Sequence, residues 1–164
     1  MITDLEQIFS DSAQNMKRSA IREILKLTQK SEIISFGGGL PAPESFPINE
    51  IKQIINELMD EDGASALQYS ATEGIMELRQ VLLERYQKEG LNIDIDNLTI
   101  TTSSQQGLYI LGKIFLNKGD KVICGLPSYL GGISAFCTFG ADMQGIRTDE
   151  KGMNSDKLEQ KLHE

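Results

Sequence analysis

The stretch with the clearest capacity for chemistry runs from Leu98 to Leu108 and contains two adjacent serines, Ser103 and Ser104. A short β-branched segment ending in hydroxyl residues is followed by apolar residues at helical spacing, which predicts a strand, a tight polar turn and a helix. Such a turn brings serine hydroxyls, free backbone N–H groups and the positive end of a helix dipole to one point. A phosphate or another anion can bind there without a lysine. The alternative is that one serine only caps the helix.

The residues that follow predict the elements that hold this turn in place. Hydrophobic periodicity indicates helices over 104–116, 130–139 and 155–162, and strands over 98–101, 121–126 and 142–147. This alternation is typical of a parallel sheet with crossover helices, so we predict an α/β fold. Ligands of such sheets bind at the carboxyl ends of the strands. The two serines and Tyr129 each follow a strand, which predicts an anion site and an exposed aromatic ring on one rim.

The first half of the chain is predicted to be mostly helical. Amphipathic spacing favours helices over 13–29 and 48–59, and the second is expected to end at 60–63. The loop over 37–47 between them carries three glycines and three prolines, which exclude regular secondary structure.

A further helix is predicted to start from a capping box and to continue to about Lys88. The box consists of Ser70 and Glu73, and the residues expected to face inward are Ile75, Leu78, Leu82 and Tyr86. Tyr69 precedes the cap and is either a packing aromatic or a phenol directed at a ligand.

Composition excludes several classes of function. Sixteen basic and twenty-four acidic side chains give a net charge of −8, which argues against nucleic-acid and anionic-membrane binding. No apolar run approaches the roughly 20 residues of a membrane span, and the N-terminus has no signal-peptide pattern, so a cytoplasmic location is expected. Cys124 and Cys137 are expected to be buried free thiols. With His163 as the single histidine, no metal site is predicted.

Four motifs, taken together, resemble the N-terminal part of a fold type I pyridoxal-phosphate (PLP)-dependent aminotransferase. They are Ser35 to Glu44, Leu67 to Gly74, Thr101 to Gln106 and Pro127 to Gly131. The nearest group includes 2-aminoadipate and kynurenine aminotransferases. The resemblance implies a partial three-layer α/β/α large domain over 48–164, truncated at its C-terminal side, after a helical arm and Gly/Pro-rich loop over 1–47. It also implies a homodimer that transfers an amino group from an amino acid to a 2-oxo acid.

The resemblance implies a cofactor role for four residues. Ser104 and Gln105 would hold the cofactor phosphate, and Tyr129 would lie against the pyridine ring. Tyr69 would reach the phosphate in the other subunit of the dimer. Ser103 stands where relatives usually carry glycine, which indicates a turn with positive φ at this position.

Three residues are implied to contact the substrate. Gly39 would lie beside the substrate carboxylate, and Ser19 and Arg22 match positions that contact an acidic substrate side chain. For Ser19 and Arg22 the alternative is a solvated helix face.

The resemblance also implies catalytic parts that are not recognisable in these 164 residues. They are the Schiff-base lysine, an aspartate paired with the pyridine nitrogen and an arginine for the substrate α-carboxylate, which in relatives lie further downstream. The chain alone is therefore expected to contain no catalytic residue, to be inactive, and to leave strand edges and apolar faces uncovered. Two alternatives are a remnant of an aminotransferase-like transcription regulator and a non-catalytic phosphate-binding α/β module.

Overall fold

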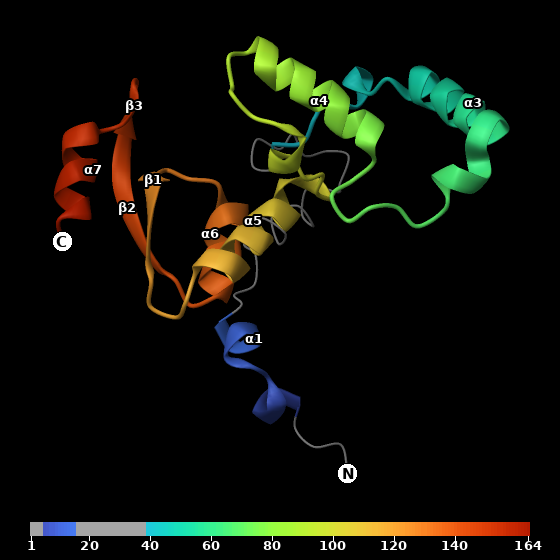
Figure 1. The fold of residues 1–164 in the computed structure, drawn as a ribbon. Helices are drawn as coiled ribbons and strands as arrows, with labels where there is room; N and C mark the ends of the chain where they lie inside the picture. The colour runs from blue at the N-terminus through green and yellow to red at the C-terminus, as the bar shows by residue number, and fades with distance from the viewer. Residues whose placement is uncertain (1–4, 16–38) are drawn as a thin grey trace. The chain divides into compact units, whose positions relative to one another are not determined.

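The computed structural model describes residues 5–15 and 39–164, which form two compact units (Figure 1). One unit consists of residues 5–15 and 101–164, and the other of residues 39–100. The predicted helix over 13–29 falls largely outside the described residues. The predicted division into an arm over 1–47 and a large domain over 48–164 is not tested by these two units and stays a prediction. In chain order the elements are η1 (Leu5–Ile8), α1 (Asp11–Asn15), η2 (Pro43–Ser45), α3 (Ile48–Ala66), α4 (Met76–Lys88), η3 (Ile95–Asn97), α5 (Ser103–Phe115), β1 (Lys121–Leu126), α6 (Leu130–Thr138), β2 (Asp142–Asp149), β3 (Gly152–Met153) and α7 (Ser155–Leu162).

A small sheet forms the centre of the first unit. Strands β1 and β2 are parallel and in register from Lys121 opposite Asp142 to Leu126 opposite Arg147, and helix α6 is the crossover between them. The short strand β3 pairs antiparallel with β2, giving the order β1-β2-β3. The α/β fold is therefore confirmed, with a sheet that is small and incomplete.

Helices α5 and α6 pack closely because a glycine lies at their crossing. Gly112 is buried, and a Cβ built on it would lie 2.7 Å from two ring carbons of Phe139 and 3.3 Å from Phe136. The ring of Tyr109 lies 5.1 Å from that of Phe139 at a tilt of 51°. Ala135 of α6 and Ile146 of β2 are the buried hydrophobic residues among those described in this unit.

The second unit is held by a buried arginine. Arg79 of α4 is 6% exposed, and its guanidinium donates to the carbonyl oxygens of Ile95 at 2.6 Å and Leu98 at 3.0 Å. Leu83, one helical turn further along α4, is also buried. These contacts fix the segment that leads toward the serine turn.

Helix α3 is longer than the sequence predicted. The segment from Asp60 to Gly63 does not end it, but Asp62 has non-helical angles (φ −150°, ψ 40°) that break the helix into two parts. The predicted stop therefore marks a real irregularity, after which one more helical turn forms.

The predicted capping box is wrong. Helix α4 begins at Met76 after Ile75, and no side chain caps it. The Glu73 carbonyl instead accepts the N–H of Ile100 at 2.8 Å, and Gly74 has a φ of +101°, which is incompatible with a helix. Of the four residues predicted to face inward, Ile75 and Leu78 are exposed, while Leu82 and Tyr86 are half-buried.

The predicted strand over 98–101 is also wrong. Leu98 is extended (φ −115°, ψ 128°), but no strand of the described residues pairs with this segment. A β-branched run predicts extended backbone, whereas a strand also requires a neighbour. The strands predicted over 121–126 and 142–147 both form, and the latter continues to Asp149.

The prediction for the two cysteines is met in part. Cys124 and Cys137 are free, as predicted, but they are half-buried rather than buried. In the part of the chain that the structure describes, no helix is long and apolar enough to cross a bilayer.

Candidate functional site

The serine turn opens helix α5. Thr102 precedes its first residue, and its side chain makes no capping hydrogen bond. The first N–H groups of an α-helix have no acceptor within the helix, so those of Ser104 and Gln105 are available to a ligand. Both residues are exposed, and the first turn contains no acidic residue that would repel an anion. The alternative that Ser104 is only a cap is not supported by this geometry, since Ser104 lies inside the helix.

The backbone of the turn is left-handed at Ser103, where φ is +63°. Ser103 is the one non-glycine residue with positive φ among the residues that the structure describes. The expectation of a positive φ at this position is confirmed. Two hydrogen bonds surround Ser103: the Thr101 hydroxyl donates to the Ser103 carbonyl at 3.0 Å, and the Thr102 N–H donates to Oε1 of Gln106.

Gln105 and Tyr129 meet at the start of helix α6. Nε2 of Gln105 donates to the carbonyl oxygen of Gly131 at 3.3 Å. The Tyr129 ring lies over the same residue, because a Cβ built on Gly131 would be 2.5 Å from two of its ring atoms. Tyr129 remains 64% exposed. The starts of α5 and α6 therefore place the serine turn and this aromatic ring on one side of the unit.

The remaining predicted residues belong to the other unit or are not described. Tyr69 is fully exposed, so it packs against no described residue. Gly39 is exposed and has a φ of +57°, and a Cβ there would have no neighbour within 4 Å. Ser19 and Arg22 lie outside the described residues.

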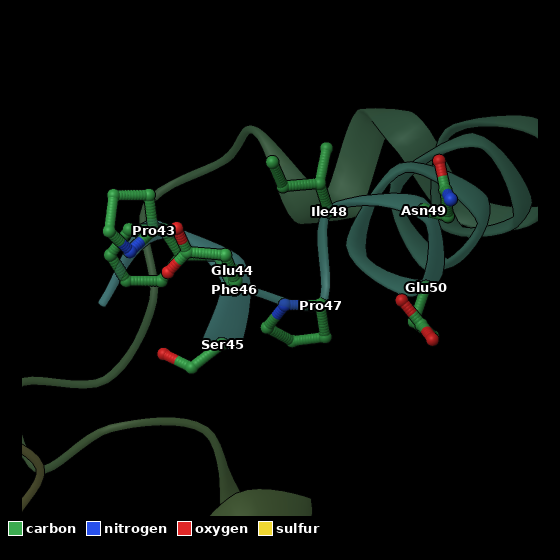
Figure 2. A pocket seen from close by; sticks show the side chains of 8 residues that line it. All are labelled: Pro43, Glu44, Ser45, Phe46, Pro47, Ile48, Asn49 and Glu50. Carbon is green, nitrogen blue, oxygen red and sulfur yellow. The ribbon is translucent and has the colours of Figure 1, made fainter. Parts of the chain in front are cut away.

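An open hollow of about 660 Å³ lies at the start of α3 (Figure 2). It is lined by residues 43–50, which include the carboxylates of Glu44 and Glu50 but none of the predicted site residues. Two carboxylates disfavour a phosphate ligand there. No group of three histidine, cysteine, aspartate or glutamate side chains that would suit a metal ion occurs in the described ranges.

Comparison with known proteins gives a consistent result. No protein-family model matches the chain. The chain is 43% identical over 98% of its length to aromatic-amino-acid aminotransferase 1 of Thermococcus litoralis, and 41% identical over 95% to 2-aminoadipate transaminase of Thermus thermophilus. The crystal structure of Pyrococcus horikoshii kynurenine aminotransferase superimposes on 99% of the chain with a TM-score of 0.88 at 39% identity. The chain corresponds to the N-terminal part of a fold type I aminotransferase.

The chain spans about two fifths of the length of these relatives: 39% and 38% of the two curated proteins and 40% of the crystal structure. A weaker match joins it to an uncharacterized HTH-type transcriptional regulator of Bacillus subtilis, at 23% identity over 92% of the chain. The higher sequence identity to the aminotransferase, 43% against 23% for the regulator, favours the enzymes as the relatives of this chain.

The sequence alone does not single out the two side chains whose hydrogen bonds surround Ser103. Thr101 and Gln106 were recognised only as members of a motif, although a glutamine four residues after Thr102 is within reach of its N–H. The spacing between Thr102 and Gln106 predicts this hydrogen bond only when the first residue of the helix is known.

Proposed function

We propose that the protein to which this chain belongs is a PLP-dependent aminotransferase that moves an amino group from an amino acid to a 2-oxo acid. The observation that carries the proposal is the exposed turn at Ser104 and Gln105 beside the Tyr129 ring. The relatives support it by their names, and one of the matching structures, that of a Thermus thermophilus α-aminoadipate aminotransferase, holds a phosphopyridoxyl compound.

The turn suits the phosphate group of such a cofactor. The N–H groups of Ser104 and Gln105 and the Ser104 hydroxyl offer donors at a helix N-terminus, where the dipole contributes about half a positive charge. Both residues are exposed in the described part of the chain, so the turn is open to a ligand there. The phosphate of PLP therefore fits the residues present.

Tyr129 suits the aromatic ring of the cofactor. Offset stacking of a pyridine ring on a phenol contributes on the order of 1 kcal/mol beyond area burial. When bound, the cofactor withdraws electrons from the α-carbon of an amino acid. The residues of this chain bind and orient it: the turn fixes the phosphate end, and Tyr129 covers one face of the ring.

The proposed contacts with substrate and partner involve Tyr69 and Gly39 of the second unit, together with Ser19 and Arg22. Fully exposed Tyr69 would reach the cofactor phosphate bound by the other subunit of a homodimer. Gly39 would lie beside the substrate carboxylate, and Ser19 and Arg22 would contact an acidic substrate side chain. The catalytic lysine would come from sequence outside these 164 residues, so the chain alone is expected to be inactive. A cytoplasmic location belongs to the same proposal.

Binding of pyridoxamine 5′-phosphate tests the proposal. This compound carries the same phosphate and ring but lacks the aldehyde that would react with surface lysines. We expect Ser104→Ala to weaken its affinity about tenfold in calorimetric titration, because a hydrogen bond to a charged group contributes about 1.5–3 kcal/mol. Tyr129→Ala is expected to weaken it about fivefold.

Ser155→Ala is the matched control, since Ser155 is an exposed serine at the start of α7 in the same unit. It is expected to change the affinity less than twofold. Equal effects of Ser104→Ala and Ser155→Ala would contradict the proposed phosphate contact. The non-catalytic module predicts phosphate binding without dependence on Tyr129.

A further inference from the structure

The turn at Ser103 contains a conformation that a serine does not hold by itself. A left-handed φ of +63° is disfavoured for a residue with a Cβ by roughly tenfold relative to ordinary helical angles. Such a conformation persists where the surrounding structure determines it. The contacts of the neighbouring residues therefore decide whether the turn keeps its shape.

Two side-chain hydrogen bonds fix the backbone on either side of Thr102 and Ser103. Oε1 of Gln106 accepts the Thr102 N–H and so holds the peptide group that enters the turn. The Thr101 hydroxyl donates to the Ser103 carbonyl at 3.0 Å and holds the peptide group that leaves it. Together they restrain the torsions that separate these two peptide groups.

The second of these peptide groups also carries the N–H of Ser104. A peptide group is planar, so its carbonyl and N–H point in opposite directions and turn together. Holding the Ser103 carbonyl toward Thr101 therefore fixes the direction of the Ser104 N–H. Donation to the carbonyl also polarises the peptide group and makes its N–H a stronger donor.

We propose that Thr101 and Gln106 are positioning residues that hold Ser103 in the left-handed conformation and thereby direct the Ser104 N–H at the bound phosphate. The identity of the ligand rests on the proposed function, whereas the restraint of Ser103 does not. Neither side chain needs to touch the ligand.

A double-mutant cycle with glycine at position 103 tests this proposal. Glycine adopts positive φ without steric cost, so it removes the need for the two restraints. We expect Gln106→Ala to raise the dissociation constant for pyridoxamine 5′-phosphate about fivefold in the natural sequence. The same substitution should raise it less than twofold when combined with Ser103→Gly. Thr101→Val should behave in the same way.

The midpoint of urea unfolding provides a readout that does not depend on the ligand. Gln106→Ala should lower the midpoint with serine at position 103 and leave it nearly unchanged with glycine. Gln53→Ala is the matched control, because Gln53 is an exposed helical glutamine whose Nε2 donates to Oε1 of Glu57, four residues along the same helix. It should show no dependence on position 103.

The outcomes separate the two proposals. Equal losses from Gln106→Ala in both backgrounds, or no loss in either, overturn the positioning role. If instead Ser104→Ala leaves the affinity unchanged, the proposed function fails, and the cycle in urea midpoints still decides whether Gln106 and Thr101 hold Ser103.

Discussion

Arg79 shows how one buried side chain can hold a backbone segment that lies 16 to 19 residues away in sequence. Its guanidinium satisfies two carbonyl oxygens in the segment that leads to the serine turn, at 2.6 and 3.0 Å. Replacement by methionine keeps most of the apolar stem but leaves both carbonyls without a donor. We expect Arg79→Met to lower the free energy of unfolding by about 2 kcal/mol, measured by urea denaturation.

Arg85→Met is the control for this prediction. Arg85 lies on the same helix but is exposed, and it pairs with Glu89 at 3.2 Å. Exposed pairs contribute little, so its replacement is expected to change the free energy of unfolding by less than about 0.5 kcal/mol. Similar losses in the two variants would mean that Arg79 does not anchor the 95–98 segment.

One backbone conformation could be predicted from a single position of the sequence. Relatives usually carry glycine where this chain has Ser103, which predicts a positive φ at this position, and the structure has one. Arg79 was missed because amphipathic spacing assigns arginine to the solvent face. Its burial depends on carbonyl oxygens 16 and 19 residues away, which no local pattern reveals.

At the scale of elements, the crossing of α5 and α6 sets the distance between the two halves of the candidate site. Gly112→Ala would place a methyl group 2.7 Å from the Phe139 ring. Because overpacking costs about 1–3 kcal/mol, we expect the melting temperature to fall by several degrees and affinity for pyridoxamine 5′-phosphate to fall with it.

Gly107→Ala in the same helix is the control, because it is not expected to lower the melting temperature. The nearest atom to a Cβ there is the Thr101 hydroxyl oxygen at 3.8 Å, an ordinary contact distance. Alanine is favoured over glycine inside helices by up to about 1 kcal/mol, so this variant should melt at the same or a higher temperature. A loss as large as that of Gly112→Ala would contradict the packing argument.

The elements that sequence predicted best are those whose partners are close along the chain. Strands β1 and β2 are neighbours in the sheet and are connected by a single helix. Gly140, with a φ of +75°, follows the end of that helix. The strand expected over 98–101 failed because its extended backbone lacks a paired neighbour. The Ser70–Glu73 capping box failed because the Glu73 carbonyl bonds to Ile100, a contact 27 residues away in sequence.

The whole molecule buries few hydrophobic side chains in the ranges described. Among the described residues, the buried hydrophobic side chains are those of Leu83 in one unit and of Ala135 and Ile146 in the other. Helix α3, in contrast, exposes apolar residues at helical spacing, including Ile51 at 48% and Ile55 at 50%. Exposed apolar stripes of this kind mark surfaces that associate with other protein.

We therefore expect the chain to self-associate at micromolar concentration through the apolar stripe of α3. Burial of one isoleucine contributes about 1.5–3 kcal/mol, so replacing both Ile51 and Ile55 by glutamate should raise the dissociation constant of the oligomer at least tenfold. Light scattering during size-exclusion chromatography measures this, with circular dichroism to verify that α3 still forms. The matched control replaces Asn49 and Asn56 of α3 by glutamate, which adds the same charge while keeping both isoleucines. A monomer for the unsubstituted chain, or equal dissociation in both variants, would assign the stripe another role.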